Sequence, residues 1–147
     1  MFRPLRILLI ILLSGIVFFS WSCGSNTAGN TAGSAEFAPN PATVASGQCT
    51  STARIVEISG NVLSLVSGTA LFTGGNGGTA RFDFTPTQLS AAFGTGTLPA
   101  NGTVAGSFTF DLGSASLALP ANGTFVVIGT GARVVTTFVG TLQCEGA

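Results

Sequence analysis

The sequence has no histidine, no lysine and no tyrosine, and only 7% of its 147 residues are charged. These absences remove the most common general base, the amine nucleophile and the phenolic acid of enzyme active sites. A Ser-His-Asp triad is excluded with them, and a zinc site would lack both imidazole and clustered thiols. We therefore expect a protein that is not an enzyme and that holds no metal and no cofactor.

Positive charge is especially scarce after the first 22 residues. That part of the chain has three arginines, Arg54, Arg81 and Arg133, against five carboxylates, so its net charge is −2. Affinity for nucleic acid is built from many cations that neutralise phosphates. The composition therefore predicts that the protein has no nucleic-acid partner.

Residues 1–22 have the organisation of an export signal. Arg3 and Arg6 precede an uncharged apolar run over residues 7–21. A helix of that length rises about 22 Å, which is less than the roughly 30 Å of a bilayer's hydrocarbon core. A positive start, a short apolar run and small residues at its end are typical of a cleaved signal. A membrane anchor lengthened by its flanking residues is the alternative.

The segment Ser20-Trp21-Ser22-Cys23-Gly24 resembles the lipobox of bacterial lipoproteins, in which a small residue precedes a cysteine that is acylated and becomes the mature N-terminus. Ser22 and Cys23 match that pattern, whereas Ser20 and Trp21 differ from the usual residues. The resemblance implies lipidation of Cys23, a membrane partner reached through N-terminal acyl chains, and a place at the outer membrane or cell surface. Cleavage by an ordinary signal peptidase, giving a soluble extracellular protein, is the alternative.

We interpret residues 23–47 as a flexible tether and residues 48–147 as the folded domain. The tether contains the motif Asn-Thr-Ala-Gly twice in succession over residues 26–33, followed by Pro39 and Pro41. Only Phe37 and Val44 in it are large and apolar, so it offers little to bury. A strand near Phe37 that joins the sheet is the alternative.

Three cysteines are an odd number for an exported protein. If Cys23 is lipidated, Cys49 and Cys144 remain as a pair for a disulfide bond in an oxidising compartment. A bridge over a loop of about 100 residues stabilises a fold by about 4–5 kcal/mol on the chain-entropy model. Two buried free thiols are the alternative.

The remaining pattern predicts an all-β domain, a small antiparallel sandwich or barrel of about 7–8 short strands. Apolar and polar residues alternate in short stretches separated by glycine-rich turns. Thr85-Pro86-Thr87-Gln88 has the form of a capping box with proline at the first helical position, so we expect one short helix over residues 86–93. The expected strands lie near residues 51–58, 61–66, 69–73, 80–84, 107–112, 115–119, 123–129 and 132–142.

The hexapeptide Leu98-Pro-Ala-Asn-Gly-Thr103 recurs identically over residues 119–124. A Phe-x-Phe stretch precedes each copy. We interpret both copies as turns in which glycine takes a positive φ, within a duplicated hairpin unit.

Asp83 and Asp111 form the best candidate pair for acid–base chemistry, with Arg81 nearby. Both alternate with phenylalanines that we expect to point inward, which makes a solvated polar cluster the simpler interpretation. A carboxylate-dependent glycan hydrolase is a minor alternative.

We predict a non-catalytic, lipid-anchored envelope or cell-surface β domain, with a binding or structural role exercised through a flat surface of threonine, serine and asparagine. The main alternative is a secreted adhesion or assembly subunit that pairs through edge strands. Neither function specifies a ligand, beyond an envelope or surface partner.

Overall fold

A computed structural model describes residues 29–146 of the chain, which form nine strands and one helix. The strands are β1 (Gly29–Ala38), β2 (Ala42–Ala45), β3 (Gln48–Val56), β4 (Leu63–Thr73), β5 (Thr79–Phe84), β6 (Thr97–Leu98), β7 (Thr103–Asp111), β8 (Ala121–Thr130) and β9 (Val134–Glu145). The helix is α2 (Pro86–Phe93). The predicted all-β fold with one short helix is confirmed.

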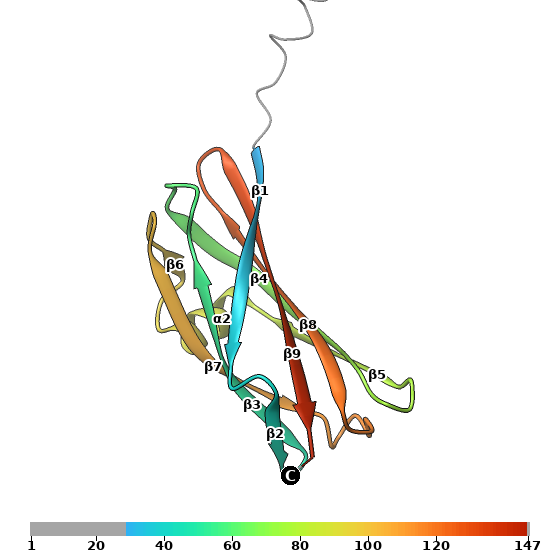
Figure 1. The fold of residues 1–147 in the computed structure, drawn as a ribbon. Coiled ribbons are helices and arrows are strands. Elements are labelled where there is room, and N and C mark those ends of the chain that lie inside the picture. Colours follow the sequence, from blue (N-terminus) through green and yellow to red (C-terminus); the bar gives the residue numbers. More distant parts are fainter. Residues whose placement is uncertain (1–28, 147) are drawn as a thin grey trace, which may run out of the picture.

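The strands form two layers that are joined along one side (Figure 1). In one layer β9, β8, β4 and β5 are antiparallel neighbours, and the short β6 also pairs with β4. In the other layer β3 pairs with β7. Strands β1 and β2 each pair both with β9, in parallel, and with β3, in antiparallel fashion. The sheet is therefore mixed and partly ring-like, whereas the sequence pattern predicts an antiparallel sandwich or barrel.

Strands β1 and β2 occupy the segment that we interpreted as a flexible tether. Phe37 and Ala42 are buried in the core, and the ring of Phe37 meets that of Phe125 edge-on at 5.3 Å. The tether prediction is therefore wrong for residues 29–45, and the alternative of a strand near Phe37 is the one observed. Residues 1–22 and Cys23 lie outside the described residues.

Strand β1 consists largely of small residues, so a strand prediction that relies on alternating large apolar residues does not detect it. A Cβ atom placed on Gly33 would lie 2.5 Å from the ring of Phe138, so the small residue allows the strand to lie against that ring. Small residues in β1 thus serve close packing, although their abundance in a sequence is typical of a linker.

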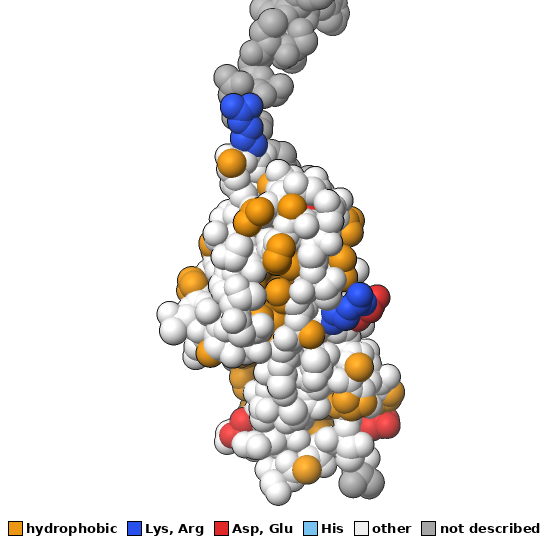
Figure 2. All heavy atoms as spheres, turned by 90° about the vertical axis from the view of Figure 1, so that its left-hand side faces the viewer, with side chains coloured by type: hydrophobic (Ala, Val, Ile, Leu, Met, Phe, Trp, Pro, Cys, Tyr) orange, Lys and Arg blue, Asp and Glu red, His pale blue; other side chains and the backbone are white. Residues whose placement is uncertain are grey.

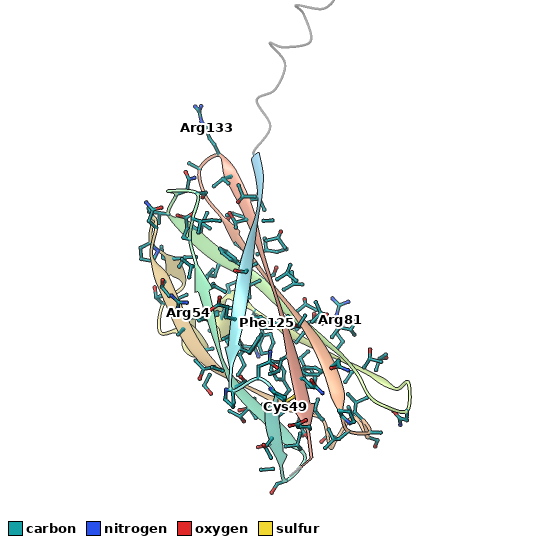
Figure 3. The ribbon with its side chains drawn as sticks, viewed as in Figure 1. Cys49, Arg54, Arg81, Phe125 and Arg133 are labelled. Atoms are coloured by element: carbon teal, nitrogen blue, oxygen red, sulfur yellow. A yellow bond between two sulfur atoms is a disulfide. The ribbon has the colours of Figure 1, made fainter. Side chains whose placement is uncertain are left out.

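The core is built from phenylalanines that alternate inward from both layers. Phe72 and Phe84 of the larger layer meet Phe110 and Phe108 of the smaller one, at ring-centroid distances of 4.9 and 5.3 Å. Phe125, labelled near the centre of Figure 3, meets Phe108 at 5.0 Å. Such contacts are favourable beyond the burial of area alone. Because side chains alternate between the two faces of a strand, the inward phenylalanines place the polar residues between them on the outer faces.

Two predicted strand boundaries need correction. The segments predicted as strands 61–66 and 69–73 are one strand, β4, with an irregularity in register between Leu65 and Ser67. The segment 115–119 is not a strand but part of the connection between β7 and β8, where Ser116 has φ 55°. Extra residues and bends of this kind interrupt the alternation on which strand prediction depends.

Helix α2 has the predicted bounds, and its capping box is formed. The hydroxyl of Thr85 accepts from the Gln88 N–H at 3.2 Å, and the Gln88 side chain accepts from the Thr85 N–H at 2.8 Å. The buried residues Leu89 and Phe93 hold the helix against β4 and β7. Gly106 of β7 permits this contact, because a Cβ there would lie 2.3 Å from the carbonyl oxygen of Ala92.

The predicted Cys49–Cys144 disulfide is present and ties β3 to β9, with the two Cα atoms 6.1 Å apart. Strand β2 pairs with both: Val44 is the register partner of Cys49, and Ala42 is that of Cys144. The bridge therefore joins the two layers at the place where β2 also joins them. Both cysteines are fully buried.

The two identical hexapeptides adopt different structures. The first forms a turn between β6 and β7, and its Asn101, not its glycine, has the positive φ, at 54°. In the second, Asn122 and Gly123 belong to β8, and Gly123 lies against the ring of Phe72. The predicted turn over residues 119–124 and the duplicated hairpin unit are therefore wrong. Tertiary packing decides between the two conformations of this short sequence.

Candidate functional site

The predicted polar cluster of Arg81, Asp83 and Asp111 is only partly assembled. On β5, the Arg81 guanidinium contacts the Asp83 carboxylate at 3.0 Å, and the Thr69 hydroxyl donates to the same carboxylate at 3.1 Å. All three side chains are solvent-accessible, so the ion pair contributes little to stability. Figure 3 shows Arg81 pointing away from the body of the fold.

Asp111 does not join this pair. Its carboxylate accepts hydrogen bonds from the Ser114 N–H at 3.0 Å and the Ser114 hydroxyl at 2.7 Å, and these lower its pKa. The rings of Phe82 and Phe110 meet across the interior at 5.5 Å. Since adjacent residues of a strand point to opposite faces, Asp83 and Asp111 face outward from opposite layers. They cannot act together on one glycosidic bond.

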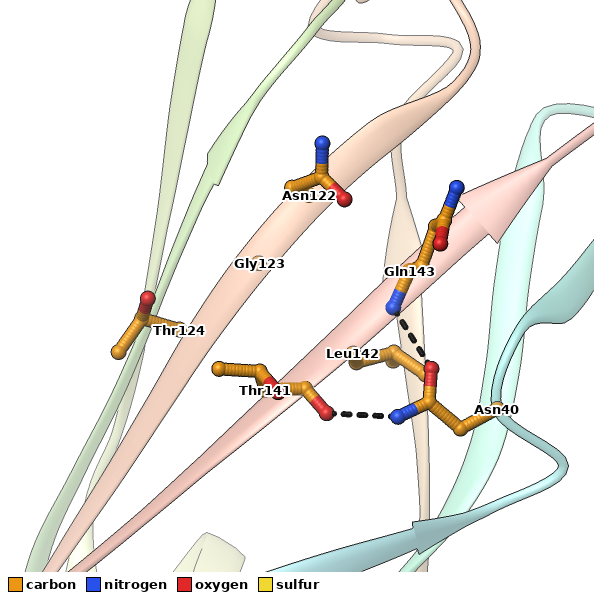
Figure 4. A pocket seen from close by; sticks show the side chains of 7 residues that line it. All are labelled: Asn40, Asn122, Gly123, Thr124, Thr141, Leu142 and Gln143. Atoms are coloured by element: carbon orange, nitrogen blue, oxygen red, sulfur yellow. Dashed lines mark hydrogen bonds between the residues drawn. The ribbon is translucent and has the colours of Figure 1, made fainter.

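A concave polar surface lies on the outer face of β8 and β9. Asn122 pairs in register with Gln143, and Thr124 pairs with Thr141, so four hydrogen-bonding side chains stand side by side. Asn40 forms the rim (Figure 4). Together with Gly123 and Leu142 these residues line a groove of about 290 Å³, which we call the amide groove. No charged residue lines it.

The side-chain amide of Asn40 makes hydrogen bonds to the backbone of β9 that a neighbouring strand would otherwise make. Its side-chain amide donates to the Thr141 carbonyl at 2.9 Å, and its carbonyl accepts from the Gln143 N–H at 2.9 Å (Figure 4). Strand β1 has left β9 by this point, and β2 has not yet joined it. The Asn40 side chain therefore fills the gap in backbone pairing and leaves the side chains of Asn122 and Gln143 facing the groove.

Glu57 is the one buried charged side chain within residues 29–146, and its role was not predicted from the sequence. It follows β3 directly, and its carboxylate accepts from four backbone N–H groups: Ser59 at 2.7 Å, Gly60 at 2.8 Å, Asn61 at 3.2 Å and Asn101 at 2.8 Å. The Ser59 hydroxyl also donates to it. The carboxylate thus ties the loop between β3 and β4 to the turn between β6 and β7.

The pKa of Glu57 reflects two opposing effects. Burial alone would raise it, but the hydrogen bonds from Ser59, Asn101 and Gly60 outweigh that effect and lower the pKa to about 2. Because its oxygens are already filled by donors of the protein, Glu57 is a structural anion rather than a general base. A glutamate followed by Ile-Ser-Gly-Asn, a turn sequence rich in small polar residues, is the signal that would have indicated its role.

A second, more apolar hollow lies between α2 and β7. Phe84, Gln88, Ala92 and Phe108 are among the residues that line it, and its volume is about 400 Å³. Strand β7 pairs only with β3 among the described strands, so one edge of β7 is unpaired beside this hollow.

Within residues 29–146 the structure has no group of three or more histidine, cysteine, aspartate or glutamate side chains that could hold a metal ion. In the same part of the chain no helix has the length and apolar character needed to cross a bilayer.

No protein-family model matches the chain, and no curated protein matches it in sequence. Among solved structures it is similar to structural genomics target SoR45, at TM-score 0.49 and 11% identity over 77% of this chain and 83% of that one. It is also similar to a protein assigned to the late embryogenesis abundant class, with a TM-score of 0.45 and 10% sequence identity. That match covers 98% of this chain and 87% of the other protein. A family 123 glycoside hydrolase from Clostridium perfringens matches with a TM-score of 0.38 and 10% sequence identity. That match covers 81% of this chain and 23% of the enzyme. Similarity at these levels carries no conclusion about function.

Proposed function

We propose that this chain is a non-catalytic β domain of the bacterial cell envelope, exported and held at the outer membrane or cell surface by an acylated Cys23, and that its amide groove binds a neutral polar ligand. The observation that carries the anchoring is the Cys49–Cys144 disulfide. It accounts for two of the three cysteines and leaves Cys23 as the third, in the segment that resembles a lipobox. A disulfide also fits an oxidising compartment.

The placement of the amide groove fits a domain anchored at its N-terminal end. Gly29, where the described chain begins, pairs with Val134 at the start of β9, and Gln143 lies near the end of the same strand. At the rise of an extended strand these two positions are about 30 Å apart. A membrane on the side of Gly29 would leave the amide groove near the opposite end of β9, about 30 Å along the strand.

The chemistry of the amide groove favours an uncharged ligand with many hydroxyl or amide groups. Asn122 and Gln143 each offer a donor and an acceptor, and Thr124 and Thr141 offer hydroxyls that can do either. A charged ligand would find no counter-ion in this lining. Each hydrogen bond to such a ligand would contribute about 0.5–1.5 kcal/mol net, so affinity depends on several acting together.

Four of the five carboxylates within residues 29–146 are engaged in hydrogen bonds or ion pairs, and the fifth, Glu145, is exposed at the end of β9. The four engaged carboxylates support a non-catalytic role. Glu57 is enclosed by donors, Asp83 is paired with Arg81, and Asp111 is bonded to Ser114. Glu36 is paired with Arg54 at 3.3 Å. A general acid would need a carboxylate that is free to exchange its proton with a bound substrate.

Incorporation of labelled palmitate tests the anchor. The wild-type chain should incorporate label and the Cys23→Ala chain should not, while Cys49→Ala should incorporate as much as wild type. Label that persists in Cys23→Ala would contradict the proposal.

Nuclear magnetic resonance titration with neutral and acidic oligosaccharides and peptides tests the amide groove. Shifts should cluster at Asn122 and Gln143 with neutral ligands, and Gln143→Ala should weaken binding severalfold. Thr109→Ala on the opposite layer is the matched control and should bind as wild type does. Equal binding by both variants, or preference for acidic ligands, would show that the groove is not the site.

Assembly through edge strands is the second candidate function. It is favoured by the unpaired edge of β7 beside the hollow that Phe84 and Phe108 line. Light scattering at increasing protein concentration distinguishes the two functions. A mass that stays at that of one chain would exclude assembly and favour the binding domain, whereas oligomers that grow with concentration would indicate assembly.

A further inference from the structure

The end of the domain where the chain enters carries an unusual surface. Three connections meet there: residues 57–62, 99–102 and 131–133. Glu57 accepts from the Asn101 N–H, and a Cβ on Gly131 would lie 3.1 Å from the Val62 carbonyl oxygen, so the three are in contact. Gly29 pairs with Val134, directly after the third connection.

Two apolar side chains project from this end into solvent. Ile58 is 69% exposed and Val62 is 58% exposed, and these are the two most exposed large hydrophobic residues within the described part of the chain. They are not left exposed by a loose loop, because Glu57 bonds to the backbone of the residues between them. The fold therefore holds both side chains outward.

The charge of this end is also distinctive. Arg133 is exposed and enters neither of the ion pairs formed within residues 29–146. It stands at the upper end of Figure 3, beside the start of β1, and Figure 2 shows a basic side chain at the same end with hydrophobic side chains close below it. The only acidic residue in the three connections is the buried Glu57. We call Ile58, Val62 and Arg133 the entry surface.

We propose that the entry surface docks onto an anionic phospholipid bilayer, so that the domain stands on the membrane rather than hanging from it. This inference rests on the anchoring proposed above. The bilayer is the expected partner of the entry surface because the anchor is close to it. Cys23 precedes Gly29 by six positions, which span at most about 20 Å even when fully extended. A bilayer that holds acyl chains at Cys23 is therefore within reach of Ile58 and Val62.

Two apolar side chains and one arginine are too few to hold a free domain at a membrane. A tethered domain needs far less, because the anchor keeps the entry surface at a high effective concentration next to the lipid. Apolar side chains enter the interface between headgroups and acyl chains, and arginine is attracted to anionic headgroups. The absence of an exposed carboxylate in the three connections avoids repulsion from the same headgroups.

Fluorescence quenching tests the docking with the mature, lipidated chain. Trp21 is the only tryptophan and is removed with residues 1–22 in the proposed mature chain, so Ile58→Trp gives the lipidated chain a single fluorophore at the entry surface. Leu119→Trp is the matched control, because Leu119 is also exposed and precedes β8 at the end opposite Thr130. The purified lipidated chains are reconstituted into phosphatidylcholine–phosphatidylglycerol vesicles with brominated acyl chains and recovered by flotation.

Docking predicts severalfold stronger quenching at position 58 than at position 119, and weaker quenching at 58 when Arg133→Glu is added. Flotation with equal or no quenching at the two positions would overturn the docking and leave the anchor standing. Failure to float would overturn the anchor, and the docking with it. A blue shift at position 58 that grows with protein concentration without quenching would identify a second copy as the occupant and also overturn the docking.

Discussion

Replacing Glu57 by glutamine should destabilise the domain by an amount that depends on pH. The pKa of this carboxyl falls from an ordinary value of 4.5 to about 2 in the folded protein. At 1.36 kcal/mol for each pKa unit, this difference corresponds to about 3 kcal/mol of folding free energy at neutral pH. That is a large share of the roughly 5–15 kcal/mol that stabilises a domain.

The pH window follows from the direction of the pKa change. Because the folded-state pKa lies below the unfolded one, the contribution is fully present above about pH 5 and is lost as the pH falls through the folded pKa, near 2. Glutamine cannot be ionised, and its amide would turn donors toward the backbone N–H groups of Ser59 and Gly60. Wild type and Glu57→Gln should therefore differ most at pH 7 and converge toward pH 2.

Urea denaturation followed by circular dichroism at pH 7, 4 and 3, with the disulfide intact, measures this difference. Glu36→Gln is the control, since Glu36 forms an exposed ion pair with Arg54 that is worth at most about 1 kcal/mol. The reasoning would be refuted if Glu57→Gln cost no more than Glu36→Gln at pH 7, or if its cost were the same at pH 7 and pH 3.

Three further changes test the packing of the fold, each read from denaturation midpoints. Cys49→Ala should cost up to about 4–5 kcal/mol, because it opens a loop of 95 positions; wild type under reducing conditions should lose a similar amount, and an unchanged midpoint would contradict this. Gly106→Ala should cost about 1–3 kcal/mol, since its Cβ would meet the carbonyl of Ala92. Gly75→Ala is the control and should be nearly neutral, because its Cβ would lie 3.6 Å from the nearest atom, the carbonyl oxygen of Pro120. Equal effects of the two changes would show that α2 does not pack so closely on β7. Asn101→Gly should be tolerated at its positive φ, while Asn122→Gly in β8 should cost about 0.5–1 kcal/mol; the reverse order would contradict the different structures of the two hexapeptides.

The sequence predicted best the features whose causes are local or chemically unique. The capping box at Thr85 and Gln88 gave the helix bounds without reference to the rest of the fold. The disulfide followed from counting thiols, and the inward phenylalanines followed from alternation along single strands. Each depends on residues that are close in sequence or that have only one possible partner.

What could not be predicted depends on packing between distant segments. Gly33 of β1 lies against the ring of Phe138, more than 100 positions later, and this contact requires a small residue. The same hexapeptide is a turn where Asn101 bonds to Glu57 and a strand where Gly123 meets Phe72. Glu57 itself is recognisable only once the turn at Asn101 is known to lie beside its own loop.

The candidate site shows the same division. The prediction of a polar surface rich in threonine and asparagine needed only the outward positions of strands. The amide groove needed the register of Asn122 with Gln143 and the arrival of Asn40 from a segment expected to be a tether. The pairing of Asp83 with Asp111 failed because similar strands of different layers face opposite ways.

Mass spectrometry of the intact mature protein, purified from its native envelope, tests the central claim most directly. The account predicts a chain that begins at Cys23, carries acyl groups on that residue, and is lighter by two hydrogens than its reduced form because of the Cys49–Cys144 bridge. A chain that begins at an unmodified Cys23, or that retains residues 1–22, would contradict it.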